Sequence, residues 1–271
     1  MSTTTISADT VKELRERTGA GFMDCKRALE ETGGDLEGAR VLLRERGMAS
    51  AGKRAGRTTT EGLVGFILDG GTGSIVGIGC ETEPVSKNDE FQTFAENVLR
   101  AVHADGPGAV ESFEQERVEL VAKLGENIVV VGAERFSAPD GNAVAGYAHP
   151  PANKIGVLVD FDGGTEELGR QLAMHISFAA PEWMTRDDVP AETVDAERGI
   201  FMNSDEVQSK SEAAREKILD GMLGKRFFAA TPGGVLVDQA WIHDPSKTVG
   251  QALSAAGASV ARFARISVAG S

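Results

Sequence analysis

The side chains best suited to covalent or metal chemistry are four histidines and two cysteines, and their spacing forms no known reaction centre. The histidines are His103, His149, His175 and His243. None belongs to an HExxH motif or forms a close pair with acidic ligands, as a zinc hydrolase requires. The sequence also lacks a GxSxG turn and a GxxxxGK[ST] phosphate loop. We therefore predict no catalytic residue, no metal site, no cofactor and no enzymatic activity.

The cysteines and a glycine-rich run favour structural roles. Cys25 and Cys80 lie far apart and form no CxxC motif, so free or buried thiols in a reducing compartment are expected. The glycines at positions 73, 77 and 79 lie in or beside an apolar run that is typical of a strand. We interpret these glycines as strand and turn positions, because an isolated glycine pattern is a weak phosphate-binding motif.

Composition limits the classes of partner. The chain has 271 residues and a net charge of -13, which disfavours broad contact with nucleic acid phosphates or anionic membranes. No apolar run approaches the ~20 residues that span a bilayer, and the polar start has no basic and apolar signal segment. We expect a cytoplasmic protein without direct contact to nucleic acid or membrane.

Residues 11–47 have the pattern of three short amphipathic helices. Ser7 is the expected N-cap of the first helix, and Gly19 follows that helix at a position that favours positive φ. The second helix is expected over residues 23–32, where it would bury Met23, Ala28 and Leu29. Asp35 caps the third, whose apolar face holds Leu36, Ala39, Leu42 and Leu43. A unit this small buries little surface, so residues 1–48 are interpreted as a docking domain.

Residues 49–60 are rich in small and basic side chains and are interpreted as a linker. Strand patterns then occur at 62–68 and 74–80, joined by an Asp-Gly-Gly-Thr-Gly turn. Two helices over 89–103 and 111–124 and a strand over 127–136 complete a first α+β subdomain at residues 61–140.

The same order of elements returns in residues 141–271. Strands are expected over 143–149, 154–160 and 259–268, with helices over 166–178 and 249–256. We predict an α+β fold in which two related subdomains each hold an antiparallel sheet covered by helices on one face. Short strands are also expected around 235–237.

The second subdomain is interrupted by a charged segment, residues 181–225. Helices over 191–202 and 205–221 would form a projecting antiparallel hairpin. Its thin apolar seam is expected to contain Ile200, Met202, Val207, Ile218 and Leu219. A surface excursion, partner contact and self-association all remain open for this hairpin.

The run LRERTGAGFMDCKRAL closely resembles the opening of the bacterial elongation factor Ts family, the guanine nucleotide exchange factors of elongation factor Tu. Further similarity lies at residues 87–92, 154–159, 173–175 and 245–251. The resemblance implies a ubiquitin-associated-like first domain that docks on the partner's nucleotide-binding domain. Matching positions imply partner contacts by Arg15, Phe22, Met23 and Lys26. From the residues alone, the favoured interpretation is that Phe22 and Met23 simply cap the small core.

The resemblance also implies an intruding turn after the first hairpin, at Thr82, Glu83, Pro84 and Val85. Family members usually carry aspartate and phenylalanine there, and this chain has Glu83 and Pro84. A shallower insertion or a differently shaped partner pocket is expected, because proline offers less apolar area than a phenyl ring. From the residues alone, Pro84 could simply shape the turn. His149 matches a further family contact near the partner's phosphate-binding region. From the residues alone, His149 could equally be an exposed hairpin residue with no role in binding.

The implied function is that of a translation elongation factor that binds elongation factor Tu in its GDP-bound and nucleotide-free forms. It would displace elements around the nucleotide and magnesium, so that GDP leaves and GTP can bind. One alternative is a non-enzymatic adaptor that uses the three-helix domain to bind another protein. The other alternative is a hydrolase with an unrecognised site, which the lack of catalytic and metal-binding motifs disfavours.

Overall fold

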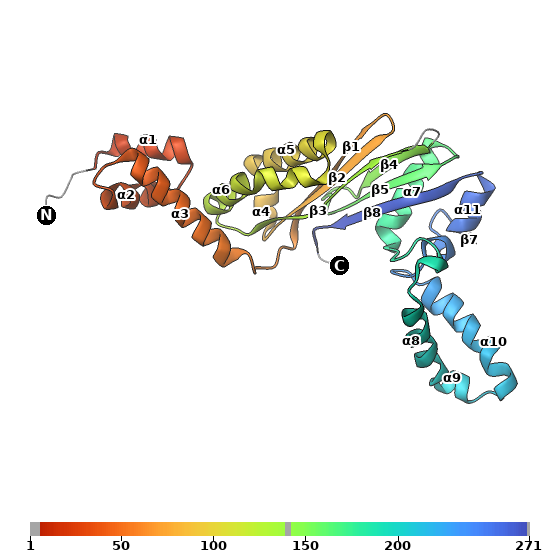
Figure 1. Ribbon diagram of the computed structural model, residues 1–271. Helices are drawn as coiled ribbons and strands as arrows, with labels where there is room; N and C mark the ends of the chain where they lie inside the picture. Colours follow the sequence, from red (N-terminus) through yellow and green to blue (C-terminus); the bar gives the residue numbers. More distant parts are fainter. Residues whose placement is uncertain (1–5, 139–141, 270–271) are drawn as a thin grey trace.

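The chain forms three parts in a row, a helical module, a pair of sheets and a projecting hairpin (Figure 1). The computed structural model describes residues 6–138 and 142–269. Helices and antiparallel sheets alternate in this range, which confirms the predicted α+β class. Among the described residues, no helix combines the length and apolar character needed to cross a membrane.

The N-terminal module consists of α1 (Ala8–Thr18), α2 (Phe22–Glu31) and the first turns of α3 (Leu36–Arg54). Its predicted caps are confirmed: Ser7 Oγ accepts from Thr10 N at 3.1 Å, Gly19 has φ 67°, and Asp35 accepts from Glu37 N. The small core is formed by Val11, Leu14, Cys25, Ala28, Leu29 and Ala39.

The predicted burial of Met23 is wrong, because its side chain is 58% exposed. Cys25, Ala28 and Leu29 share one face of α2 at spacings of three and four residues. Met23 lies two residues before Cys25 and so projects from the opposite side of the helix.

The predicted linker over 49–60 is wrong in its first half, where α3 continues to Arg54. Ala51 is only 6% exposed and joins the core of the first sheet subdomain. Gly47 lies against Ala122, so α3 approaches α6 (Glu114–Leu124) closely. Small side chains that suggested a flexible linker instead permit close helix contact, and alanine is also the best helix former.

The first sheet has the order β1-β2-β3, from Glu61–Asp69, Thr72–Cys80 and Ile128–Ser137. Helices α5 (Asp89–Asp105) and α6 cover one face of it. Their shared core includes Val76, Ile78, Phe91, Phe94, Val98 and Ile128. The expected helix over 111–124 starts later than predicted, since a 3-10 helix, η1 (Pro107–Phe113), precedes α6. A short helix that was not predicted, α4 (Glu83–Ser86), follows β2.

The second sheet repeats this plan with the order β4-β5-β8, from Asn142–Ala148, Ile155–Asp162 and Ser259–Ser267. Helices α7 (Glu166–Ala179) and α11 (Val249–Ala255) pack on its outer face. Their core includes Val157, Val159, Phe161, Leu172, Ile176 and Leu253. The strand-pair, helix, strand order therefore recurs as predicted.

The inner faces of the two sheets pack together, an arrangement that the sequence did not indicate. Their shared core contains Val64, Ile75, Phe136, Leu158, Ile266 and Val268. Glycines permit this close approach, because an added Cβ on Gly77 would lie 2.4 Å from Ile266 Cγ2 and one on Gly156 would lie 2.5 Å from Val64 Cγ1. Gly73 and Gly77 are thus strand positions, as expected, and they face the other sheet.

A polar network centred on the buried Asp160 and the partly exposed Arg262 also joins the sheets. The Asp160 carboxylate, 2% exposed, accepts from Arg262 Nε at 3.0 Å and from Asn142 Nδ2 at 3.1 Å. Arg262 Nη2 donates across the sandwich to the Ser137 carbonyl at 3.1 Å, and its guanidinium stacks on Phe136. This network lies at the end of the sandwich where β5 and β3 terminate.

The projecting hairpin consists of α8 (Ala191–Met202), α9 (Asp205–Gln208) and α10 (Glu212–Met222), followed by a π-helical turn, η3 (Leu223–Phe228). The predicted helix over 205–221 is interrupted at residues 209–211. Arg198 joins α8 to α10 through Glu216 and Asp220. Val207 and Leu219 are fully buried, but Ile200 is 63% exposed, so its predicted place in the seam is wrong. Ile200 lies two residues from Arg198, which faces α10, and therefore points away.

The strands expected around 235–237 are also wrong. Gly233 and Gly234, both with positive φ, turn the chain, and a 3-10 helix, η4 (Leu236–Asp238), follows. Within the described part of the chain, Val235 forms an isolated bridge with Trp183 and belongs to no named strand. A small ribbon of β6 (Ala240–Trp241) and β7 (Asp244–Thr248) comes next.

Candidate functional site

The segment Thr82–Val85 leaves the end of β2 and forms the start of α4 on the surface. Glu83 and Pro84 are exposed, and proline is tolerated there because the first turn of a helix needs no backbone donor. Lys87 Nζ lies 2.7 Å from the Glu83 carboxylate, and this hydrogen bond lowers the pKa of Glu83. The nearby Lys154 ammonium also lowers that pKa, so Glu83 carries a negative charge at neutral pH.

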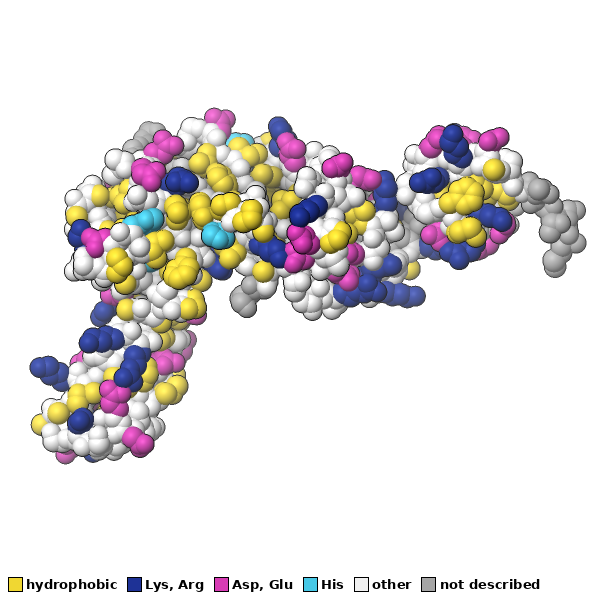
Figure 2. Space-filling view, turned by 180° about the vertical axis from the view of Figure 1, so that it is seen from behind, with side chains coloured by type: hydrophobic (Ala, Val, Ile, Leu, Met, Phe, Trp, Pro, Cys, Tyr) yellow, Lys and Arg dark blue, Asp and Glu magenta, His cyan; other side chains and the backbone are white. Residues whose placement is uncertain are grey.

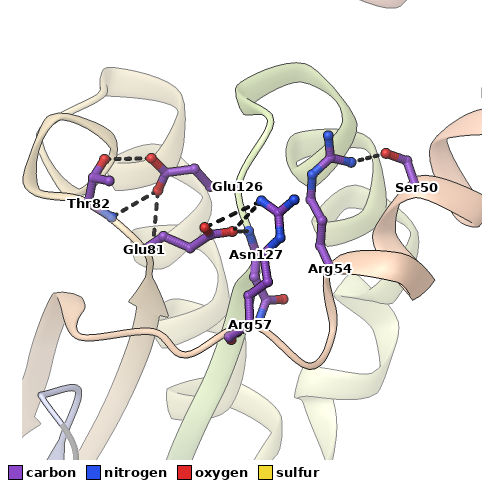
Figure 3. A network of polar contacts seen from close by, with 7 residues as sticks. All are labelled: Ser50, Arg54, Arg57, Glu81, Thr82, Glu126 and Asn127. Atoms are coloured by element: carbon purple, nitrogen blue, oxygen red, sulfur yellow. Dashed lines mark hydrogen bonds and ion pairs between the residues drawn. The ribbon is translucent and has the colours of Figure 1, made fainter.

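Two carboxylates fix the peptides that lead into this segment (Figure 3). Glu126 Oε2 accepts from Glu81 N at 3.1 Å and from Thr82 N at 3.0 Å, and Glu126 Oε1 accepts from Thr82 Oγ1 at 2.5 Å. In return, Glu81 Oε1 accepts from Asn127 N at 2.7 Å. We call Glu81 and Glu126 the crossed carboxylates. They join the loop after β2 to the loop before β3.

The turn between β4 and β5 lies at the same end of the sandwich as Thr82–Val85. Lys154 Nζ lies 2.5 Å from the carboxylate of Glu61, the residue paired with Cys80 at the end of β2. The Asn153 carbonyl accepts from Val64 N at 2.6 Å. On this turn, His149 is exposed and its Nδ1 lies 3.0 Å from Tyr147 Oη. The structure therefore places Thr82–Val85 and the His149 turn at one end of the sandwich.

The remaining predicted contacts lie on the N-terminal module. Phe22 and Met23 are 46% and 58% exposed, and Figure 2 shows hydrophobic side chains on the surface of this module. Arg15 is exposed and Lys26, paired with Glu30 at 3.8 Å, is half-buried. These four residues form a third group, which is separate from the segment Thr82–Val85 and from the His149 turn.

Contacts nevertheless link this module to the sandwich. Gly19, at the turn before α2, lies against the Lys123 side chain at the end of α6. Lys123 Nζ lies 2.6 Å from the carboxylate of Glu90, in the first turn of α5. Since α4 directly precedes α5, the module's exposed turn and Thr82–Val85 are connected through one packed set of helix ends.

The residues that could support other chemistry have structural surroundings. His175 is fully buried, its Nε2 lies 3.0 Å from Gln239 Oε1, and burial lowers its pKa. Cys25 and Cys80 are buried free thiols, and burial raises the pKa of Cys80 to about 12. Within the described ranges, no group of three His, Cys, Asp or Glu side chains could hold a metal ion.

Sequence reasoning missed the residues that arrange the site, namely Glu61, Glu81, Glu126, Asn127 and Lys154. One signal was available for the crossed carboxylates. Glu81 directly follows an apolar strand and Glu126 closely precedes another, so neighbouring antiparallel strands place the two at one sheet edge. The pairing of Lys154 with Glu61 depends on how the two sheets pack, and no local pattern indicates that.

Comparison with known proteins gives a consistent result over nearly the whole chain. A family profile described as Elongation factor TS matches residues 81–270. Elongation factor Ts of Alkalilimnicola ehrlichii is 42% identical over 275 residues, which cover 97% of this chain and 92% of that protein. The corresponding protein of Methylococcus capsulatus is 42% identical over 276 residues, with the same coverage. Elongation factor Ts of Escherichia coli O139:H28 is 40% identical over 267 residues, 97% of this chain and 91% of that protein.

Proposed function

Because this chain belongs to the elongation factor Ts family, we propose that it binds elongation factor Tu and promotes the release of GDP, so that GTP can bind. The observation that carries this proposal is the exposed, negatively charged Glu83 beside Pro84, held at one end of the sandwich next to the His149 turn. Such an exchange factor works in the cytoplasm, where translation takes place, and needs no covalent chemistry of its own.

Exchange requires only a difference in binding free energy. If the chain binds the nucleotide-free partner more tightly than the GDP-bound partner, linkage requires that it weaken GDP binding by the same factor. The structure offers two kinds of surface for this. Exposed Phe22 and Met23 can bury apolar area against the partner, and Glu83 can place negative charge near the groups that hold the nucleotide and its magnesium.

We assign the three groups of residues separate tasks. Arg15, Phe22, Met23 and Lys26 dock the module on the nucleotide-binding domain of elongation factor Tu. The segment Thr82–Val85 enters beside the nucleotide site and displaces elements around the magnesium. His149 contacts the same domain near its phosphate-binding region, and the Lys154–Glu61 ion pair fixes the spacing between this histidine and Glu83.

An adaptor function is the second candidate, and the exposed Phe22 and Met23 favour it. In that case the three-helix module would bind another protein and the sandwich would be a scaffold. An adaptor binds its partner equally well whether or not GDP is present. Dependence of affinity on GDP therefore separates the two candidates.

Isothermal titration calorimetry of the full chain against elongation factor Tu tests the proposal. We expect a lower Kd for the nucleotide-free partner than for the GDP-saturated one, and a charge reversal, Glu83→Lys, should reduce that difference. A matched control is Glu37→Lys, an exposed acidic residue in the first turn of α3. Equal Kd values in the two nucleotide states would overturn the exchange function and favour the adaptor.

A further inference from the structure

We propose that Glu126 is a positioning residue for nucleotide exchange. Its carboxylate sets the direction in which Thr82–Val85 leaves the sandwich, and so the direction in which Glu83 and Pro84 meet the partner. This inference rests on the proposed function and adds a residue that does not itself contact the partner's nucleotide site.

Three hydrogen-bond donors of one loop converge on the Glu126 carboxylate. One carboxylate accepts from two consecutive backbone N–H groups, those of Glu81 and Thr82, and from the Thr82 hydroxyl. Hydrogen bonds to an ionised acceptor are about twice as strong as neutral ones. Because α4 begins at the very next residue, Glu83, fixing these two peptides fixes the orientation of α4.

The contacts of Glu81 and Glu126 are reciprocal. Glu81 accepts from Asn127 N, so the two carboxylates hold each other's loops, as Figure 3 shows. Asn127 is 2% exposed and its Nδ2 donates to the Arg57 carbonyl at 2.8 Å. Arg57 Nη1 in turn lies 3.3 Å from Glu81 Oε1.

These contacts extend the arrangement to the N-terminal module. Arg57 lies three residues after α3, the helix that carries the module. The crossed carboxylates thus connect three parts of the chain at one point: the residues that follow α3, the start of β3 and the segment Thr82–Val85. Docking by Phe22 and insertion by Glu83 would then occur from a single rigid frame, which lowers the entropy lost when both surfaces bind.

The Glu126 side chain holds the loop and is not part of the apolar core. The core beneath the loop is apolar and includes Ile78, Cys80 and Ile128, whereas the side-chain hydrogen bonds of Glu126 all go to the loop. Strands β2 and β3 are also held by a backbone ladder that runs from Thr72 to Cys80, with one register shift between Gly77 and Ile78. Loss of the Glu126 carboxylate should therefore loosen the segment and leave the sandwich folded.

The test is Glu126→Gln, with Glu116→Gln as control. Glutamine keeps the shape but offers one acceptor oxygen to three donors. Glu116 is an exposed glutamate on α6, so its replacement removes the same charge. Release of a fluorescent GDP analogue is measured over a range of elongation factor Tu concentrations. For Glu126→Gln we expect kcat to fall about 10- to 100-fold, the size expected when a reacting group is misplaced by about 1 Å, with KM within about twofold.

A double variant supplies the second readout. If Glu126 acts through the segment, adding Glu126→Gln to Pro84→Ala should reduce kcat much less than Glu126→Gln does alone, because coupled residues are not additive. Amide hydrogen exchange of the free chain should also speed up at Glu81 and Thr82 and stay unchanged in β2 and β3. Additive losses, or unchanged protection of these amides, would overturn the positioning role.

The remaining outcomes are equally decisive. A wild-type chain that fails to accelerate release contradicts the proposed function itself, whereas an active wild type with an equally active Glu126→Gln variant contradicts only the positioning role. If Glu126→Gln does not unfold cooperatively, the residue is structural and the inference is wrong as stated.

Discussion

Glu83 and Pro84 are both exposed at the start of α4, where the family resemblance implies an aspartate and a phenylalanine. The negative charge is kept at position 83, where Lys87 lowers the pKa of the carboxyl group. At position 84 a compact pyrrolidine ring stands where the resemblance implies an aromatic one. The first prediction concerns this loss of apolar area.

Replacing Pro84 with Phe should raise kcat/KM for GDP release from elongation factor Tu of Escherichia coli about three- to tenfold. A phenyl ring buries more apolar area than a pyrrolidine, and at ~25 cal/mol per Å2 the gain is roughly 1 kcal/mol. Pro84→Ala should change the rate in the opposite direction. Stopped-flow fluorescence measures both, and an unchanged rate for Pro84→Phe would show that position 84 only shapes the turn.

His175 should make the free energy of unfolding depend on pH. Burial lowers its pKa in the folded chain below the ordinary value of 6.5, so the unfolded state binds more protons in acid. Stability from this residue is therefore complete above about pH 6.5 and is lost as the pH falls below it. Urea unfolding at pH 7 and pH 5 should show a smaller difference for His175→Gln than for the wild type.

At the scale of elements, the packing of the two sheets depends on glycines. Gly77→Ala should lower the free energy of unfolding by roughly 1–3 kcal/mol, because the new methyl group would overlap Ile266 and Val131. The control is Gly199→Ala in α8, where nothing lies within 4 Å of the added atom. That change should be neutral or stabilising by about 0.5–1 kcal/mol. Equal effects at the two positions, measured by urea unfolding, would contradict this packing.

The continuity of α3 leads to a second prediction about elements. Ala49 is exposed in the middle of this helix, so Ala49→Pro removes a helical hydrogen bond without changing a core. We expect the Kd for nucleotide-free elongation factor Tu to rise about tenfold or more. A bend in α3 would lower the effective concentration of Thr82–Val85 at the partner once the N-terminal module is docked. Ala49→Ser keeps the helix and should bind like the wild type in calorimetry. An unchanged Kd for Ala49→Pro would show that binding does not require a straight, rigid α3.

Local patterns predicted most of these elements, and long-range contacts account for the differences. Ser7, Gly19 and Asp35 act within a few residues of their helices, so the caps could be recognised from the sequence. The extension of α3 depends instead on Ala51 reaching the core of another subdomain. The surface positions of Phe22 and Thr82–Pro84 followed from the family resemblance, whereas Val85 packs against the core of the first subdomain. The Glu126 carboxylate acts on residues 44 and 45 positions away, which no local pattern indicates.

On the scale of the whole molecule, the module and the helical hairpin lie at opposite ends of an elongated chain (Figure 1). Both surfaces assigned to elongation factor Tu, the module and the end of the sandwich near α4, belong to the half away from the hairpin. They are connected by α3, Lys123 and the crossed carboxylates. The architecture therefore favours a factor that contacts one partner domain at two points.

The release of GDP tests this conclusion most directly. Elongation factor Tu is loaded with a fluorescent GDP analogue and mixed in a stopped-flow instrument with excess unlabelled GDP and increasing amounts of the full chain. We predict that the release rate rises with the concentration of the chain and then saturates. A release rate equal to the spontaneous rate at every concentration, with a partner that calorimetry shows to be bound, would contradict the exchange function and leave the adaptor in its place.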